Sequence, residues 1–224
     1  KRAECAILNG ADLVIELPFI YSTATAELFA KGAVDILSKS NIVDFLSFGS
    51  ECGDIETLNK TCDILLSDEF DRKLKELLKK GSSFPSARQK ALSLFSDNED
   101  ILASPNNILA IEYLKAIKVL NSKLKPLTVK RLLVNYNEEK IKDNITSASF
   151  ARKLLVEDPN SFKKVVPLNV YNIINEEIAK NNALADIRKL DTALLYKLRL
   201  MSDDEIKNIF DVSEGFEYRI IKAK

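Results

Sequence analysis

Four short polar segments, each at the expected end of a strand or start of a helix, carry residues that could do chemistry. The first, residues 48–54 (FGSECGD), follows a β-branched and apolar run. Gly49 has no Cβ and would let a ligand approach the backbone closely, and Ser50 could donate a hydrogen bond. The alternative is a plain strand-to-helix turn, in which glycine supplies a positive φ and Glu51 or Asp54 caps the following helix.

The second segment, residues 104–107 (SPNN), has the composition of a helix start, with Ser104 as the cap and Pro105 in the first turn. Free N–H groups at such a start suit an anion. The adjacent amides of Asn106 and Asn107 could also read a base edge or a ribose. The alternative is an ordinary capped helix.

The third segment, residues 125–137, places Lys130 next to Arg131 within an apolar run. On a strand these two side chains point to opposite faces. A cation in such a run is rarely buried without a partner, so we expect one of the two to meet an anion. The alternative is a charge on an edge strand that points to water.

The fourth segment, residues 144–153, has Ser147 and Ser149 at a helix start and Arg152 one turn in, on the side of Ser149. Hydroxyls, free N–H groups and a guanidinium converge in this way around a polyphosphate. The alternative is a serine N-cap with an exposed arginine.

The elements that must position these segments alternate between strands and helices, which predicts a Rossmann-like parallel sheet covered by helices. Ligands of open parallel sheets bind beyond the carboxyl ends of the strands, so the four segments together favour a nucleotide site at one edge. We expect strands at 11–18, 42–51 and 125–136, and helices at 1–9, 23–40, 55–80, 84–95, 105–122 and 147–157.

From about residue 159 the pattern is helical only. We therefore expect a Rossmann-like nucleotide-binding domain over residues 1–158 and an α-helical domain over residues 159–224. Interleaved acids favour a solvated surface for the basic residues of the second domain, but these residues could also touch the phosphates of a nucleic acid. They are Lys163, Lys164, Arg188 and Lys189.

The composition excludes several classes of function. Lysine plus arginine and aspartate plus glutamate each number 33, so no global basic field points to nucleic acid. The three cysteines lack CxxC spacing and there is no histidine, which argues against zinc and excludes Cys-His catalysis within this chain. No apolar run approaches the roughly 18 residues of a membrane span, and we expect a cytoplasmic protein with reduced thiols.

The order of the motifs resembles the tRNA(Met) cytidine acetate ligase family, which has a nucleotidyltransferase-like Rossmann-type fold. GADLVIELPF, SPNN and the Ser-Ala-Ser-x-x-Arg segment are the most specific of the matching motifs. The full set covers nearly the whole chain: RAECAILNGADLVIELPF, AELFAKGAVDIL, FGSECGD, SPNNILAIEYLKAI, KPLTVKR, VNYN, ITSASFARK and EGFEYRI.

The resemblance implies an enzyme that activates acetate with ATP, giving acetyl-adenylate and pyrophosphate, and then acetylates N4 of the wobble cytidine in elongator tRNA(Met). It implies that Gly49, Asn106 and Arg131 bind ATP. It also implies that the segment of Ser147, Ser149 and Arg152 lies near the phosphates, and that the tRNA lies on the helical region. Mg²⁺ is compatible with ATP as co-substrate, but no carboxylate cluster in the sequence marks its place.

The sequence departs from the family at its start, where the family has a strand and a His-x-Gly-His loop that stabilises the leaving pyrophosphate. We therefore expect an internal piece of the enzyme, inactive alone, with its catalytic residues upstream of Lys1. Two alternatives stay open. One is a non-catalytic module that binds tRNA or a nucleotide, and the other is a transferase of the same fold that acts on another acceptor.

Overall fold

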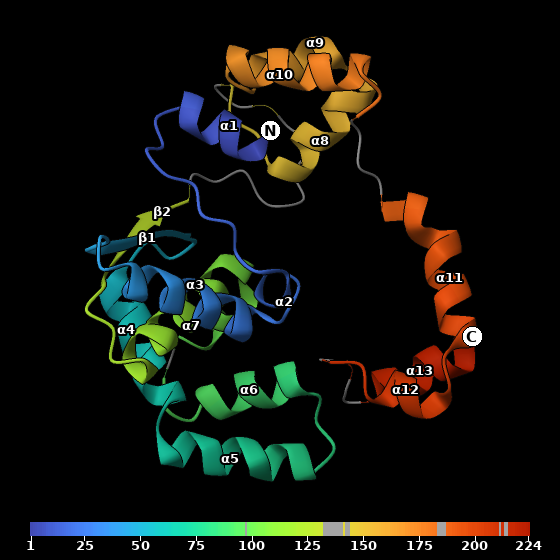
Figure 1. The fold of residues 1–224 in the computed structure, drawn as a ribbon. Helices are drawn as coiled ribbons and strands as arrows, with labels where there is room; N and C mark the ends of the chain where they lie inside the picture. Colours follow the sequence, from blue (N-terminus) through green and yellow to red (C-terminus); the bar gives the residue numbers. More distant parts are fainter. Residues whose placement is uncertain (97, 132–140, 142–143, 183–186, 211, 213–214) are drawn as a thin grey trace. The chain divides into compact units, whose positions relative to one another are not determined.

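A computed structural model describes residues 1–96, 98–131, 141, 144–182, 187–210, 212 and 215–224 (Figure 1). The chain divides into two compact units. One unit runs from Glu16 to Leu132, and the other combines Lys1 to Ile15 with Leu133 to Lys224. Each unit is described by itself.

The unit of residues 16–132 contains a parallel pair of strands, β1 (Phe45–Ser50) and β2 (Lys125–Lys130), with Phe45 opposite Lys125 and Ser50 opposite Lys130. Parallel neighbours need a long crossover, and here the helices between the two strands supply it. The helical elements of this unit are α2 (Phe19–Ser22), α3 (Ala26–Ser40), α4 (Ile55–Leu65), α5 (Asp68–Lys79), α6 (Phe84–Leu92), the 3-10 helix η1 (Glu99–Ala103) and α7 (Pro105–Val119).

Helix α7 lies at the centre of this unit, where it packs against α3, α4 and β1 (Figure 1). Its apolar residues recur at helical spacing and are buried, including Ala110, Ile111 and Leu114. The ring of Phe48 on β1 stacks on that of Tyr113 with 5.6 Å between centroids. The position of α7 relative to the strand is therefore fixed by a continuous core.

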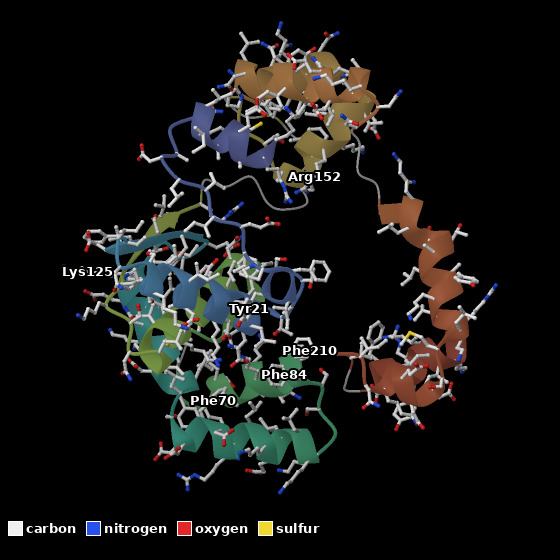
Figure 2. The ribbon with its side chains drawn as sticks, in the orientation of Figure 1. Tyr21, Phe70, Phe84, Lys125, Arg152 and Phe210 are labelled. Atoms are coloured by element: carbon white, nitrogen blue, oxygen red, sulfur yellow. The ribbon has the colours of Figure 1, made fainter. Side chains whose placement is uncertain are left out.

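Two further contacts hold helices of this unit together. Gly32 of α3 lies against Tyr21 of α2, so closely that a Cβ at position 32 would come within 2.7 Å of the ring (Figure 2). The buried Glu112 of α7 accepts a hydrogen bond from Arg88 of α6 at 2.7 Å and one from Lys115 at 2.8 Å. The first contact needs a residue without a side chain, and the second leaves the buried carboxylate paired.

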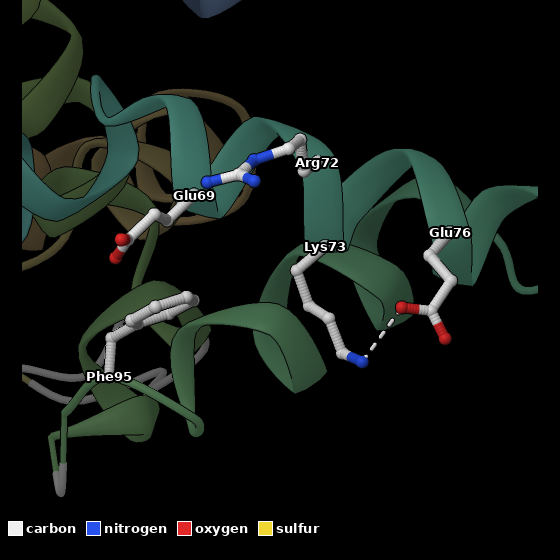
Figure 3. Close-up of a pocket in the computed structure, with 5 residues that line it drawn as sticks. All are labelled: Glu69, Arg72, Lys73, Glu76 and Phe95. Carbon is white, nitrogen blue, oxygen red and sulfur yellow. Dashed lines mark hydrogen bonds and ion pairs between the residues drawn. The ribbon is translucent and has the colours of Figure 1, made fainter.

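The outer face of α5 carries ion pairs one turn apart, such as Asp71–Lys75 at 2.6 Å, and is solvated. A hollow of about 350 Å³ lies where α5 faces Phe95 (Figure 3). In it the ammonium of Lys73 contacts Glu76 at 2.8 Å, and Lys73 with Lys80 lowers the pKa of Glu76 to about 2. Of the charged side chains that line the hollow, Lys73 and Glu76 are thus paired with each other.

In the other unit, α1 packs on α10, where Asn9 donates to Asn169 at 3.2 Å. Helix α8 packs on α9, and the ring of Phe162 on α9 lies 6.3 Å from that of Tyr171 on α10. Gly10 follows α1 at a φ of 102°, which confirms the predicted helix end at Asn9-Gly10. The bounds are Arg2–Leu8 for α1, Ala148–Glu157 for α8, Pro159–Lys164 for α9 and Leu168–Ala179 for α10.

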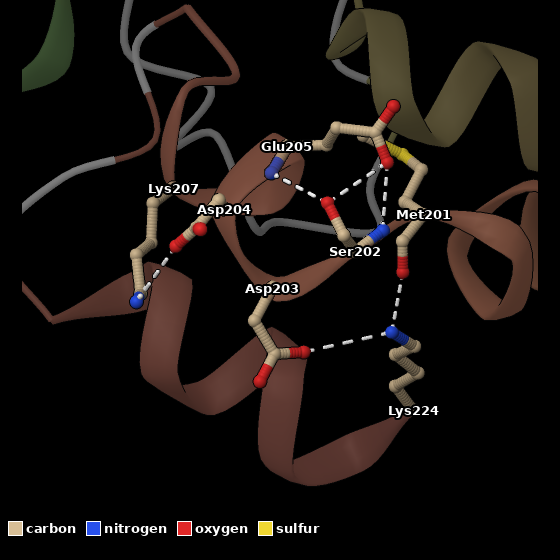
Figure 4. Close-up of polar contacts among 7 residues, drawn as sticks. All are labelled: Met201, Ser202, Asp203, Asp204, Glu205, Lys207 and Lys224. Carbon is tan, nitrogen blue, oxygen red and sulfur yellow. Dashed lines mark hydrogen bonds and ion pairs between the residues drawn. The ribbon is translucent and has the colours of Figure 1, made fainter.

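The same unit contains the 3-10 helix η2 (Ile187–Leu190), α11 (Asp191–Leu200), α12 (Asp203–Lys207) and α13 (Phe216–Ala223). Ser202 and Glu205 form a capping box at the start of α12 (Figure 4). The ammonium of Lys224 lies 3.6 Å from Asp203 and donates to the carbonyl of Met201. These contacts tie the end of α13 to the start of α12.

The predicted α/β class with a parallel sheet is confirmed, and the described residues from 159 onward contain helices but no strand. The predicted buried strand at 11–18 is wrong. This segment is not strand, and Leu13 is 60% exposed, because no other described segment pairs with its backbone. The predicted third strand is present as β2, whereas its continuation over 132–136 lies outside the described residues.

None of the helices in the described ranges is long and apolar enough to cross a membrane. The predicted domain boundary at Asp158–Pro159 stays a prediction.

Gly32→Ala should destabilise the protein by about 1–3 kcal/mol, because the added methyl meets the Tyr21 ring in a packed contact. Urea unfolding would measure the change. In a Tyr21→Ala background the same substitution should be neutral or stabilising, because alanine favours a helix more than glycine does. Equal destabilisation in both backgrounds would contradict the packing explanation.

Glu112→Gln should lower the free energy of unfolding by about 2 kcal/mol, because it leaves the partly buried Arg88 without its carboxylate and Lys115 with Glu27 alone. Glu69→Gln is the matched control, since that side chain is exposed, and it should change stability by less than about 0.5 kcal/mol. Similar values for the two variants would show that the buried cluster adds no stability.

Candidate functional site

The end of β1 and the start of α7 are joined by reciprocal hydrogen bonds between Glu51 and Asn107. The Oδ1 of Asn107 accepts from the backbone N–H groups of Glu51 at 3.0 Å and Cys52 at 3.1 Å. In return, a carboxylate oxygen of Glu51 accepts from the backbone N–H of Asn107 at 2.8 Å. The N–H groups expected to be free for an anion at this helix start are therefore bonded to the protein's own carboxylate.

Of the two adjacent asparagines, only Asn106 keeps a polar atom directed away from this junction. Its Nδ2 donates to Glu51 at 2.6 Å, and its Oδ1 accepts from Nη1 of Arg131 at 3.4 Å. The amide orientation is consistent on both sides, since the NH₂ faces a carboxylate and the oxygen faces a guanidinium. The Asn107 side chain is 4% exposed and bonded internally, so the prediction that two adjacent amides could read a ligand is wrong for Asn107.

The carboxylate of Glu51 is charged at neutral pH. Partial burial raises its pKa, but hydrogen bonds from the Asn106 side chain and from backbone N–H groups outweigh this effect and lower the pKa below its usual value. A negative charge at the start of α7 also suits the positive end of the helix dipole.

Gly49 lies beside Arg131, the residue that follows β2. A Cβ at position 49 would be 3.2 Å from Cγ of Arg131, and the backbone N–H of Arg131 donates to the Ser50 carbonyl at 2.9 Å. Among the described residues, no carboxylate lies within ion-pair distance of Arg131. The structure thus brings Gly49, Asn106 and Arg131 together.

The rest of the 48–54 segment forms a turn. Gly53, rather than Gly49, has the positive φ, at 66°, and Asp54 caps α4 by accepting from the backbone N–H groups of Glu56 and Thr57. The expectation that Ser50 donates to a ligand is wrong. Its side chain is fully buried and bonded to Thr128 at 2.7 Å, because it points into the strand pair.

The second predicted set lies in the other unit, at the start of α8. Ser147 is the N-cap, and its Oγ accepts from the backbone N–H of Phe150 at 3.1 Å. The hydroxyls of Ser147 and Ser149 are 3.1 Å apart, and Arg152 projects from α8 as an exposed side chain (Figure 2). The predicted helix start is confirmed, whereas a contact with phosphate stays a prediction.

The basic residues predicted to meet RNA are exposed in two places. Lys163 and Lys164 end α9, where the ammonium of Lys163 lies 5.5 Å from the centre of the Tyr171 ring. Arg188 and Lys189 lie on η2. Within the described part of the chain, no group of three His, Cys, Asp or Glu side chains could hold a metal ion, so no residue there is assigned to Mg²⁺.

Comparison with known proteins identifies the family of the chain. A model of the HIGH nucleotidyl transferase family matches residues 1–224. The chain belongs to the HIGH nucleotidyl transferase family.

Curated relatives within this nucleotidyl transferase family share a common name. The "tRNA(Met) cytidine acetate ligase" of Caldanaerobacter subterraneus subsp. tengcongensis is 42% identical over 100% of this chain, which spans 57% of that protein. The relative of the same name from Clostridium tetani is 40% identical over 99% of this chain, which spans 58% of that protein. These identities confirm the predicted resemblance, and the chain spans less than two thirds of these relatives.

A solved structure of a related protein shows the same fold. A crystal structure of Thermotoga maritima TmcAL bound with alpha-thio ATP superposes with a TM-score of 0.87 and 33% identity. The superposition covers 98% of this chain and 53% of the TmcAL chain. The apo form of the same protein gives a TM-score of 0.90, with 98% of this chain and 54% of that chain covered.

The sequence patterns of this nucleotidyl transferase did not indicate the two residues that join β1 to α7 at the candidate site. Glu51 was expected at most to cap the helix after its own strand, yet it caps α7, which begins about 55 residues later. Asn107 was expected to face a ligand, yet it holds the turn after β1. A glutamate after a strand and an asparagine in a helix start are common, and only the packing of α7 on β1 pairs them.

Asn107→Ala should destabilise the fold by about 2 kcal/mol, because it leaves the buried N–H groups of Glu51 and Cys52 without an acceptor. Asn106→Ala is the matched control and should cost less than about 1 kcal/mol, since that side chain is only partly buried. Thermal and urea unfolding would measure both. An equal loss for the two variants would contradict the different roles of these neighbours.

Proposed function

We propose that this protein is an ATP-dependent acetate ligase that forms acetyl-adenylate and acetylates N4 of the wobble cytidine of elongator tRNA(Met). The observation that carries the proposal is the 42% identity, over the whole chain, to a protein named tRNA(Met) cytidine acetate ligase. The related TmcAL structure with alpha-thio ATP supports ATP as the co-substrate.

ATP would contact Gly49, Asn106 and Arg131. Gly49 leaves room for the Arg131 side chain to lie against the strand end, and Arg131 brings a guanidinium that has no carboxylate partner among the described residues. Arginine suits such a role because its planar donor group binds phosphate and ribose oxygens at defined angles. Asn106, held by Glu51, would contribute an amide oxygen.

The proposed reaction has two balanced steps. A carboxylate oxygen of acetate attacks the α-phosphorus of ATP, the bond to the bridging oxygen breaks, and pyrophosphate leaves with acetyl-adenylate formed. The N4 amine of the cytidine then attacks the acetyl carbon, loses a proton and expels AMP. Acetate is ionised at neutral pH, as carboxylic acids generally are, so the first step needs no general base from this chain.

The contribution of this chain to the first step would be mainly positioning and charge stabilisation. Arg131 and Arg152 would offset the charge that develops on the phosphates, and Ser147 and Ser149 would supply hydroxyl groups. Mg²⁺ stays compatible with ATP, without a residue assigned to it here.

The helical region would hold the tRNA through its basic residues. Its binding should then weaken with salt, because phosphate contacts release counterions. The residues proposed for these contacts are Lys163, Lys164, Arg188 and Lys189.

Acetate-dependent exchange between ATP and labelled pyrophosphate tests the proposal on the full-length protein. The native protein should exchange only with acetate present, and Arg131→Ala should lower the rate about 10- to 100-fold, as expected for the loss of charged hydrogen bonds. Arg72→Ala is the matched control, because this exposed arginine lines the hollow on α5, and it should exchange normally.

Other outcomes would favour the alternatives. Absence of exchange, with or without tRNA(Met), would leave a module that binds a nucleotide or tRNA. Exchange without transfer of labelled acetate to tRNA(Met) would leave an enzyme with another acceptor.

A further inference from the structure

We propose that Glu51 is a positioning residue of the nucleotide site, which fixes the amide of Asn106 and reserves the start of α7 for the nucleoside part of the ligand rather than for phosphate. The inference rests on the proposed binding of ATP by Gly49, Asn106 and Arg131. Glu51 itself would not touch the nucleotide.

The carboxylate of Glu51 holds the first turn of α7 through three donors. One oxygen accepts from Nδ2 of Asn106 at 2.6 Å and from its backbone N–H at 3.3 Å. The other accepts from the backbone N–H of Asn107 at 2.8 Å. The side chain of Asn106 is thereby held with its NH₂ turned inward and its Oδ1 turned toward Arg131.

This orientation determines which part of a nucleotide can pair with Asn106. A ligand meets an acceptor, Oδ1, because the donor side of the amide is already bonded. A nucleoside carries donors, namely the ribose hydroxyls and the amine of adenine, whereas an ionised phosphate carries only acceptors. The exposed edge of Asn106 is therefore complementary to the nucleoside.

Charge leads to the same assignment. The start of a helix carries about half a positive charge, which commonly attracts phosphate. Here the ionised carboxylate of Glu51 already lies on that start and uses its N–H groups. A phosphate at the same position would meet a negative charge and no free backbone N–H of the helix start, whereas an uncharged nucleoside would not be repelled by that charge.

Glu51→Gln tests the role, because glutamine has nearly the same shape but no charge. Glutamine keeps only one of the two acceptor oxygens, so either Asn106 or the backbone N–H of Asn107 loses its partner. The start of α7 also loses its negative charge, and the amide of Asn106 should no longer be held in one orientation. In the full-length protein, displacement of a fluorescent ATP analogue by adenosine, ATP or tripolyphosphate would give the three affinities. Glu51→Gln should bind adenosine and ATP about 10-fold more weakly than the native protein does, in line with one lost hydrogen bond in a partly buried site. It should bind tripolyphosphate as tightly as the native protein or more tightly.

Matched variants separate positioning from a structural role. Glu56→Gln, at an exposed position in the first turn of α4, should leave all three affinities unchanged. Asn106→Leu should weaken the binding of adenosine as Glu51→Gln does. If Glu51→Gln does not fold, Asn106→Leu tests the inference in its place. The double variant should lose no more adenosine affinity than Asn106→Leu alone, because Glu51 acts through Asn106.

Tighter ATP binding by Glu51→Gln with unchanged adenosine binding would overturn the inference, since the start of α7 would then be a phosphate site. Unchanged affinities in both Glu51→Gln and Asn106→Leu would overturn it as well, while the proposed function would stand. If the native protein bound neither ATP nor adenosine, the proposed function would fail together with the inference.

Discussion

The candidate site depends on the reciprocal hydrogen bonding between the end of β1 and the start of α7. Each partner completes the unfinished backbone of the other, because Glu51 accepts from the first N–H groups of α7 and Asn107 accepts from the turn after β1. The junction gives an acceptor to the backbone N–H groups of Glu51, Cys52, Asn106 and Asn107, and it fixes two chain segments about 55 residues apart. Asn106 and Gly49 keep their relative position as long as this junction is intact.

Packing around α7 supports the same junction. Its apolar face is buried against β1, α3 and α4, and the buried Glu112 ties it to α6 through Arg88. A rotation of α7 about its axis would break the ion pair and the Asn107 contacts together. The first turn of α7 is therefore a rigid support for a ligand, as a site that reads hydrogen-bond geometry requires.

Local sequence signals predicted the elements better than they predicted the site. The helix starts at Ser104-Pro105 and Ser147 and the end at Asn9-Gly10 were found because caps act within one turn. The run at 11–18 was misread as a strand, because an apolar run indicates burial or pairing only if a partner exists. The contact of Gly49 with Arg131 depends on the register of two strands about 80 residues apart, which no local pattern encodes.

One anionic and one cationic side chain with different surroundings lie at this strand edge. The carboxylate of Glu51 is hydrogen-bonded to the start of α7 and to the Asn106 side chain, whereas Arg131 has no carboxylate partner among the described residues. In the described part of the chain, this edge therefore has a guanidinium without a carboxylate partner and an amide oxygen 3.4 Å from it. A ligand that satisfies both must carry an anionic oxygen and a hydrogen-bond donor on the same molecule. A nucleotide meets this requirement, whereas pyrophosphate or a nucleoside alone meets only half of it.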